Sequence, residues 1–184
     1  MKTRTNKSRQ QPLCASCPVR NLTIYLGDGA KNCDEVQSFR KTWRRVAKRT
    51  VFVWENEVCD EFFTVYQGWA YCYRLAPDGA RQIVEFLLPG DGISLTALYR
   101  NRMYFSVRAL TDVILCVFDS AAMSEFIHAR PPLARRLEEF WMRESFPLSN
   151  RLMDLGRRSG APRVARLILD LHQRTKIRGA ANDG

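Results

Sequence analysis

The stretch Phe63-Thr-Val-Tyr-Gln-Gly-Trp-Ala-Tyr-Cys-Tyr-Arg74 decides the fold, because its residues alternate in character with a period of two. The alternation holds before Gly68 and resumes directly after it. A period of two is typical of half-buried strands, since successive side chains point to opposite faces. The stretch therefore predicts two β-strands, one on each side of the glycine.

Turn signals and further strands follow this stretch along the chain. Pro77-Asp-Gly79 predicts a tight turn, because Pro presets the first central residue and Gly accepts a positive φ. The chain then returns as a strand over 81–88 until Pro89-Gly-Asp-Gly92 ends it, and two more strands are expected between Phe105 and Phe118. Many short strands at this spacing predict an antiparallel sandwich or jelly roll.

Helices are expected on both sides of the strands. Apolar residues three or four apart predict a short amphipathic helix with a basic outer face over Asp34–Val46. A second short helix is expected at Ser120–His128, and Pro131-Pro132 opens a long one. A last amphipathic helix is expected from Pro162, which suits a first helical position, and the polar segment 179–184 is interpreted as a linker.

The long helix carries an apolar stripe that needs a partner. Its members fall three and four residues apart, close to the seam of a coiled coil. Pro147 removes a backbone donor within the helix, so a kink is expected there. A second copy of the same helix is the simplest partner, which predicts a homodimer. The expected interface consists of Leu133, Leu137, Phe140, Trp141, Glu144, Leu148, Leu152 and Leu155, among which Glu144 interrupts the stripe with a charge.

Composition excludes several classes of protein. The chain has 184 residues, 46% of them hydrophobic, which suits one packed domain with an appendage. Its formal net charge of +10 attracts anions without choosing among nucleic acid, acidic lipid and an acidic protein. The first twenty residues are basic without an apolar run, so neither a secretory signal nor a membrane span is expected, and a cytoplasmic location is predicted. No catalytic triad, Gly-rich phosphate loop or acid–base carboxylate pair is evident, so an enzyme is not expected.

The chain contains six cysteines, and four of them attract attention by their positions. Cys14, Cys17 and Cys33 lie before the strands, and Cys116 lies within a predicted strand. In a reducing compartment such residues serve as buried thiols, metal ligands or redox groups rather than as a disulfide framework. Their spacing alone leaves these choices open.

The order of these segments resembles the Crp/Fnr family of bacterial transcription regulators, and it is closest to the Fnr branch. Four segments carry the resemblance in this order: Phe63-Thr-Val-Tyr-Gln-Gly-Trp69, Ala76-Pro-Asp-Gly-Ala-Arg-Gln-Ile83, Leu88-Pro-Gly-Asp91 and Arg108-Ala-Leu-Thr-Asp-Val-Ile-Leu-Cys116. The resemblance implies an α+β fold in which an antiparallel β-roll is flanked by short helices and followed by a long dimerisation helix. The implied β-roll is a double-stranded β-helix, or jelly roll, like the cyclic nucleotide-binding domain.

The resemblance also implies a division of the chain. Residues 1–33 would form a flexible cysteine-bearing arm, 34–130 the β-roll sensor domain with flanking helices, 131–178 the dimerisation helix and a following short helix, and 179–184 a linker. Family members continue into a helix-turn-helix whose second helix enters the major groove of DNA. DNA binding is therefore expected only through a C-terminal domain not present in this chain. A truncated regulator that acts by forming mixed dimers with a full-length relative is the alternative.

Iron–sulfur members of the Fnr branch hold a 4Fe-4S cluster with three N-terminal cysteines and one strand cysteine. Cys14 and Cys17 match their C-x-x-C pair, and Cys116 matches the strand cysteine. The third family position is occupied here by Thr23, and Cys33 is the thiol that replaces it in this interpretation. The resemblance thus implies redox or oxygen sensing by a cluster on Cys14, Cys17, Cys33 and Cys116. Zinc on the same four sulfurs, or no metal at all, remains open.

Cyclic nucleotide is not expected as a ligand. Family members that bind it carry a Gly-Glu pair after the Pro-Gly-Asp corner and an Arg-Ser pair before the following strand. The matching positions here are Ser94-Leu95 and Met103-Tyr104, so both charged groups that hold the nucleotide are missing. A phosphate buried opposite Met103 would lack its charge-assisted hydrogen bonds.

Overall fold

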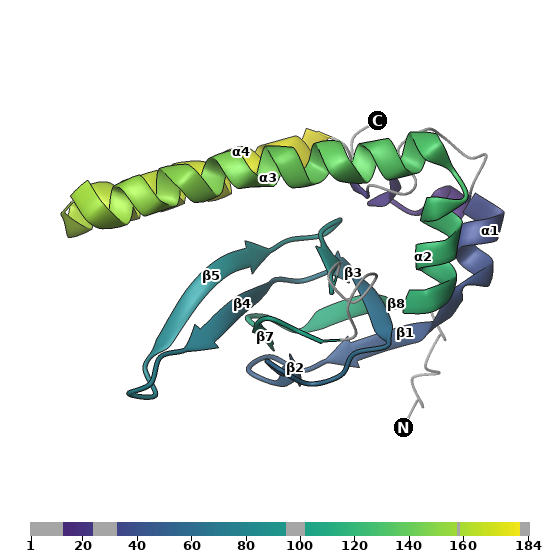
Figure 1. The fold of residues 1–184 in the computed structure, drawn as a ribbon, viewed down its shortest axis with the longest axis horizontal. Helices are drawn as coiled ribbons and strands as arrows, with labels where there is room; N and C mark the ends of the chain where they lie inside the picture. The colour runs from purple at the N-terminus through teal and green to yellow at the C-terminus, as the bar shows by residue number, and fades with distance from the viewer. Residues whose placement is uncertain (1–12, 24–32, 95–101, 158, 181–184) are drawn as a thin grey trace, which may run out of the picture.

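The computed structural model describes residues 13–23, 33–94, 102–157 and 159–180, and it shows a β-roll beneath two long helices (Figure 1). In these residues the strands form two four-stranded antiparallel sheets. The first sheet has the order β1 (Arg40–Val46), β8 (Val113–Asp119), β3 (Glu61–Gln67), β6 (Gly92–Ile93). The second has the order β2 (Val51–Val53), β7 (Ser106–Ala109), β4 (Ala70–Leu75), β5 (Arg81–Leu87). The predicted antiparallel roll is confirmed.

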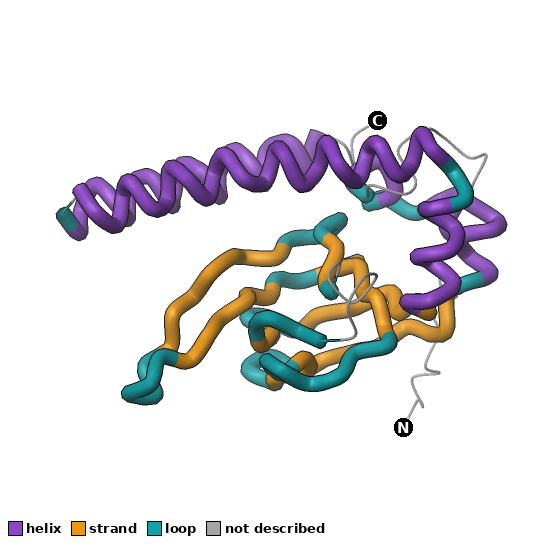
Figure 2. Tube along the Cα trace, in the orientation of Figure 1, coloured by secondary structure: helices purple, strands orange, loops and turns teal. Residues whose placement is uncertain are grey.

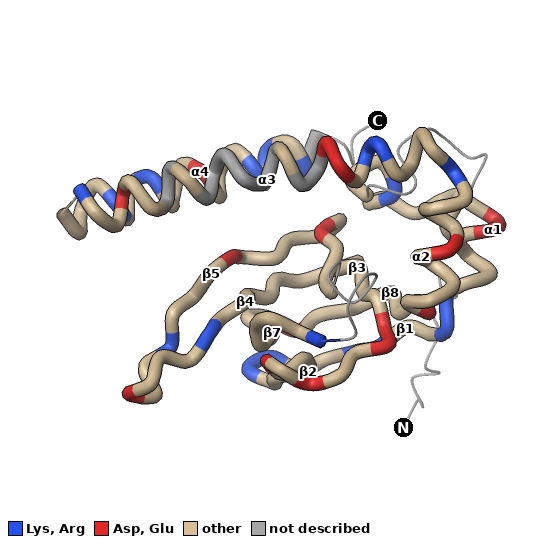
Figure 3. Tube along the Cα trace, viewed as in Figure 1, with Lys and Arg blue, Asp and Glu red and all other residues tan. Residues whose placement is uncertain are grey.

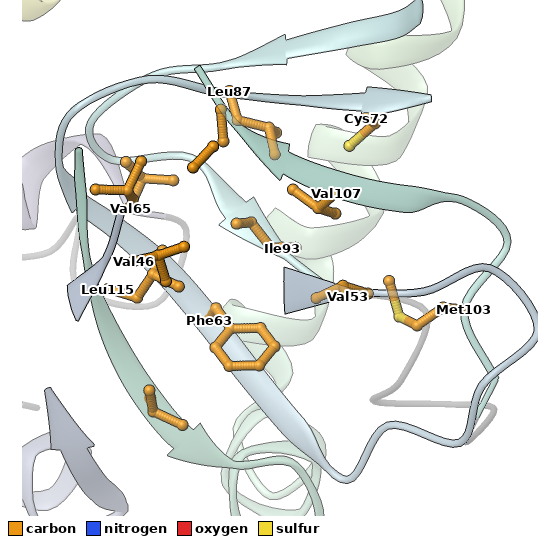
Figure 4. Packing of buried hydrophobic residues seen from close by; sticks show 14 residues of the cluster. Val46, Val53, Phe63, Val65, Cys72, Leu87, Ile93, Met103, Val107 and Leu115 are labelled. Atoms are coloured by element: carbon orange, nitrogen blue, oxygen red, sulfur yellow. The ribbon is translucent and has the colours of Figure 1, made fainter. Parts of the chain in front are cut away.

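The core of the roll lies between the two sheets. Its side chains come from both sheets and meet in one buried cluster, as the close view in Figure 4 shows. Phe63 and Leu115 contribute from the first sheet and Val107 from the second, and each is at most 1% exposed. Because every second residue of a strand points inward, the period of two in the sequence produces this core directly.

The turn at Gly68 requires glycine. Its φ is +87°, and a Cβ at this position would lie 2.1 Å from the carbonyl oxygen of Asp112. The next residue, Trp69, donates its backbone N–H to Thr111 Oγ1 at 2.9 Å. The β3–β4 turn therefore packs against the turn between β7 and β8, and a larger residue would separate them.

One predicted element is wrong. The structure replaces the expected helix over Asp34–Val46 with a short helix, α1 (Cys33–Ser38), followed by the strand β1. Phe39 and Trp43 are four residues apart, and this spacing suits one face of a strand as well as one face of a helix. Pairing with β8 decides between the two, because it satisfies the backbone of Arg40–Val46 at an edge of the sheet.

Three helices follow the last strand. The predicted short helix is confirmed as α2 (Ser120–His128), which Asp119 caps by accepting a hydrogen bond from Ala122 N at 2.9 Å. The long helix α3 (Pro131–Arg157) runs through Pro147 without an interruption, and the kink expected there stays a prediction. α4 (Gly160–Ala180) begins two residues before the predicted start and extends into the predicted linker. Residues 181–184 lie outside the described part of the chain.

The two long helices lie above the strands in the view of Figure 2, and the short helices α1 and α2 lie beside their right-hand end. Basic and acidic residues are interspersed along α3 and α4 (Figure 3). Of the helices that the structure describes, none has the length and hydropathy needed to cross a membrane.

Candidate metal centre

The described part of the cysteine arm packs on the outer face of the β1–β8–β3 sheet. It contains two 3-10 turns, η1 (Cys14–Ser16) and η2 (Arg20–Leu22), and it is followed by α1. Cys14 donates its backbone N–H to Gln37 Oε1 at 2.9 Å, which ties η1 to α1. Residues 1–12 and 24–32 of the predicted arm lie outside the described part of the chain. The described section of the arm therefore places Cys14 and Cys17 next to α1.

Three of the four predicted cysteines share one buried hydrophobic cluster. Cys14 is 6% exposed, Cys33 1% and Cys116 7%. Cys116 reaches this cluster because side chains alternate along β8: Leu115 and Val117 point into the roll, and Cys116 points to the outer face. The arm then covers that outer face, so residues 14 and 116 meet although they are far apart in the sequence.

Cys17 lies at the edge of the same site. It is partly exposed, and its charge raises the pKa of both Cys14 and Cys116. Cys33 in turn raises the pKa of Cys17 and of Cys14. Cys17 thus lies within electrostatic range of each of the other three predicted cysteines.

Burial is the main influence on these thiols. Burial first, and then nearby Cys17 and Cys14, raise the pKa of Cys116 to about 12, whereas Arg40 opposes the shift. Burial likewise raises the pKa of Cys14 and of Cys17, and Arg40 lowers both. Cys14, Cys17 and Cys116 therefore stay protonated at neutral pH in the metal-free protein, and a metal would displace their protons.

We expect this burial to make stability depend on pH. Below pH 9.0, the ordinary pKa, the Cys116 thiol is protonated in both the folded and the unfolded chain. Between pH 9.0 and about 12 the unfolded chain releases this proton and the folded chain keeps it, so the free energy of unfolding falls as pH rises. Urea unfolding of the metal-free protein at pH 7, 9 and 10 should show a steeper loss for the wild type than for Cys116→Ala. Equal slopes would show that Cys116 ionises freely.

The donor set fits a metal, although its arrangement here is not that of a metal site. Four thiols are the donors that structural zinc and iron–sulfur clusters use. Within the described ranges, however, no group of three or more His, Cys, Asp or Glu side chains is placed to hold a metal ion. The structure therefore gathers the cysteines without setting them as ligands, and a bound metal stays a prediction.

An unsatisfied donor beside the cysteines supports the same type of occupant. Trp43 pairs with Cys116 across β1 and β8, and it packs against the cluster that contains Cys14, Cys33 and Cys116. Its indole Nε1 is buried and has no hydrogen-bond partner among the described residues. A buried donor without an acceptor is costly, and protonated thiols are weak acceptors. Thiolates and inorganic sulfide are stronger acceptors than thiols, so an unpaired donor in this cluster favours an anionic sulfur group over protonated thiols.

Sequence reasoning missed two residues of this site, because it assigned them to a helix. Arg40 lies on β1 with its guanidinium 5.4 Å from the centre of the Trp43 ring, and it is the cation that acts on the thiols. Trp43 also contacts Tyr66, with ring centroids 4.5 Å apart. Phe39 lies before β1, and the two apolar residues of the strand, Trp43 and Val46, are three apart and pack in different clusters, so no same-face period in the sequence indicates the strand.

The residues predicted for the dimer interface fall into three groups. Leu133 and Leu137 are 5% and 2% exposed and pack inside the protomer, in the same cluster as the cysteines. Leu152 and Leu155 are 63% and 55% exposed. The side chains of Phe140, Trp141, Glu144 and Leu148 lie outside the part that the structure describes. The exposed end of the stripe is therefore C-terminal.

The positions that match a nucleotide pocket in the family are apolar or uncharged here. Met103 is 1% exposed and belongs to the core of the roll, and Tyr104 is 50% exposed. Ser94 is buried with a φ of +67°, and Leu95 lies outside the described residues. The expectation that cyclic nucleotide does not bind stays a prediction.

Comparison with known proteins gives the same picture of the fold. The cyclic nucleotide-binding domain family matches residues 43–130. The nitrogen fixation regulation protein FixK of Bradyrhizobium diazoefficiens is 34% identical over 92% of this chain and 70% of its own length. The transcriptional activatory protein AadR of Rhodopseudomonas palustris is 33% identical over 86% of this chain and 65% of its own length. The chain thus spans about two thirds of these relatives.

Solved structures agree with this result. The structure of FixK2 from Bradyrhizobium japonicum superposes with a TM-score of 0.67 at 25% identity, over 72% of this chain and 66% of that protein. The catabolite activator protein of Thermus thermophilus gives a TM-score of 0.62 at 17% identity, over 72% of this chain and 62% of that protein. The second likeness shows the fold alone.

Proposed function

Because this chain belongs to the Crp/Fnr family of transcription regulators, we propose that it forms the sensor and dimerisation part of such a regulator. The relatives it matches are transcription regulators and not enzymes. In this proposal the chain acts in the cytoplasm, and it acts on DNA through a C-terminal domain outside the residues described above. The recognition helix of that domain would enter the major groove.

The observation that carries the proposal is the shared cluster of the cysteines and the helices. Cys14, Cys33 and Cys116 pack in one hydrophobic cluster with Phe126 of α2 and with Leu133 and Leu137 of α3, as well as with other residues of the first sheet. A rearrangement of the cysteines therefore directly alters the packing of Leu133 and Leu137, near the N-terminal end of α3. Because packed cores shift between discrete arrangements, such a change can reposition the helix.

The proposed signal is redox state or oxygen, and the proposed cofactor is a 4Fe-4S cluster on Cys14, Cys17, Cys33 and Cys116. When bound, a cluster of this kind supplies a centre that reacts with oxygen. The chain contributes the four thiols, the Arg40 cation that favours the charged form of Cys14, Cys17 and Cys116, and the Trp43 N–H, which has no acceptor among the described residues. Zinc in the same thiols would give a structural centre without redox chemistry, and it is the alternative occupant.

The proposed dimer uses the exposed end of the apolar stripe. Leu152 and Leu155 on α3, and Leu167 and Ile168 on α4, expose large apolar side chains. A cavity of about 350 Å³ lies beside them, lined in part by Ile83 of β5. Exposed apolar side chains on both long helices favour a partner, and in this proposal a second copy supplies it.

The mass of the protein in solution tests the proposal. Light scattering on anaerobic, iron-loaded protein should give a dimer, and exposure to air should shift the equilibrium toward the monomer as the centre is lost. The reason is that the cysteine cluster and the base of α3 share one packed core. If air removes the iron and the mass in solution stays the same, the metal centre does not control dimerisation.

A further inference from the structure

The corner that joins β5 to β6 holds an anchor for the last helix. The carboxylate of Asp91 accepts a hydrogen bond from Leu88 N at 2.8 Å, one from Arg174 Nη2 at 2.9 Å, and one from Arg178. Both arginines belong to α4. The side chains of Asp91, Arg174 and Arg178 are only 18–20% exposed, so water and salt screen this contact less than they screen a surface ion pair.

Two backbone carbonyls complete the anchor, one in the corner and one near the end of β5. Arg178 donates Nε to the carbonyl oxygen of Pro89 at 2.9 Å, and Arg174 donates Nη2 to that of Phe86 at 3.0 Å. In Figure 1 the turn after β5 rises from the roll toward the long helices. Two guanidinium groups thus bind this part of the roll, and each makes charge-assisted hydrogen bonds to it.

The cysteine arm contacts the same corner from another side. Gly90 has a φ of +94°, and a Cβ built on it would lie 2.5 Å from the Cβ of Leu22. Leu22 closes η2, five residues after Cys17. A side chain of the arm therefore rests on the bare backbone between the two groups that hold α4, the carbonyl of Pro89 and the carboxylate of Asp91.

The corner is also fixed to the strand that carries the cysteine site. Val65 of β3 donates its N–H to the carbonyl oxygen of Asp91 at 3.0 Å and accepts from Gly90 N at 2.8 Å. The neighbouring residue on β3, Thr64, pairs with Cys116 on β8. A corner held in this way moves as a unit, so a displacement by the arm passes to the acceptors of the arginines.

We propose that the corner Leu88–Asp91 couples the cysteine arm to α4. Leu22 seated on Gly90 keeps the acceptors of Arg174 and Arg178 in place, and withdrawal of the arm loosens α4 from the roll. The coupling is reciprocal, so release of the arginines loosens the arm by the same factor. As a route for a signal, the coupling rests on the proposed function, in which the arm is the part that senses.

Hydrogen–deuterium exchange on the metal-free protein tests this coupling. Leu22→Ala should speed the exchange of α4 amides between residues 168 and 176 about fivefold or more, because Leu22 rests on the corner to which the α4 arginines are bound. Leu13→Ala is the matched control, because Leu13 belongs to the arm but is 56% exposed. Its α4 amides should exchange as in the wild type.

The reverse experiment leaves the roll and the arm unchanged in sequence. Arg174→Gln combined with Arg178→Gln should speed exchange at residues 19–23 by a similar factor. Arg166→Gln is its control, because Arg166 pairs with Asp154 at 3.2 Å and not with the corner. Near-ultraviolet circular dichroism verifies that each variant is folded. If Leu22→Ala is unfolded, Leu22→Val takes its place in the experiment.

The coupling would be wrong if Leu22→Ala speeds exchange only in the arm and the arginine variants speed exchange only in α4. A failure of the proposed function looks different. A chain that never binds iron but shows both reciprocal effects would keep the coupling and lose the proposed cofactor. A chain that binds iron and shows no reciprocal effect would lose the coupling and keep the cofactor.

Discussion

Cys116→Ala is expected to leave the anaerobically reconstituted protein without its iron. Cys116 supplies the one proposed ligand that comes from the roll, and the other three come from the arm and its junction with α1. Loss of a direct ligand should weaken metal binding by more than about 100-fold, since loss of a residue that only supports a ligand already costs 10 to 100-fold. Iron and sulfide analysis, with the visible absorption spectrum, measures the effect.

The matched control for this variant is Cys72→Ala. Cys72 is also a buried strand cysteine, at 3% exposed, but it belongs to the core between the sheets and not to the cysteine cluster. It should keep its iron. Equal iron content in Cys116→Ala and the wild type would show that Cys116 is not a ligand. A further variant, Cys33→Ala, tests whether Cys33 is the fourth ligand.

Leu152→Glu combined with Leu155→Glu should convert the proposed homodimer into monomers. Both leucines are more than half exposed in the protomer, and they lie three residues apart on one face of α3. Burying two carboxylates in an apolar interface should raise the dimer dissociation constant by at least about 100-fold, because central apolar anchors each contribute about 2 kcal/mol or more. Sedimentation velocity at several concentrations measures the change.

The control for the dimer variant is Leu75→Glu, which places a carboxylate at a leucine that is 56% exposed at the end of β4. This variant should dimerise as the wild type does. If the α3 variant also dimerises normally, the proposed interface is wrong and the apolar face of α3 and α4 has another partner.

The roll could be predicted from the sequence because the signals for its strands and turns lie within short segments. The period of two around Gly68 and the turn at Pro77-Asp-Gly79 each specify a strand or a reversal within a few residues. The segment Arg40–Val46 could not be assigned in this way. Its apolar spacing is compatible with both a helix and a strand, and pairing with β8, about seventy residues away, decides the outcome.

The candidate site likewise contains residues that the sequence could identify and residues that only the folded structure brings together. The four cysteines could be identified from their spacing and from the family resemblance, and the structure places them together. Trp43 and Arg40 could not be assigned to the site, because they join it only after β1 pairs with β8. The contacts of Asp91 with Arg174 and Arg178 link residues 83 and 87 positions apart, so they depend on the path of the whole chain.

The most direct test of the account is the iron and acid-labile sulfide content of the wild-type chain purified without oxygen. A 4Fe-4S cluster on these cysteines predicts a coloured protein with about four iron and four sulfide per chain, bleached by air. A colourless protein without iron, and with all six thiols titrating as free cysteines, would contradict it. The cysteine cluster would then be a packing feature of a dimerising β-roll whose signal enters elsewhere.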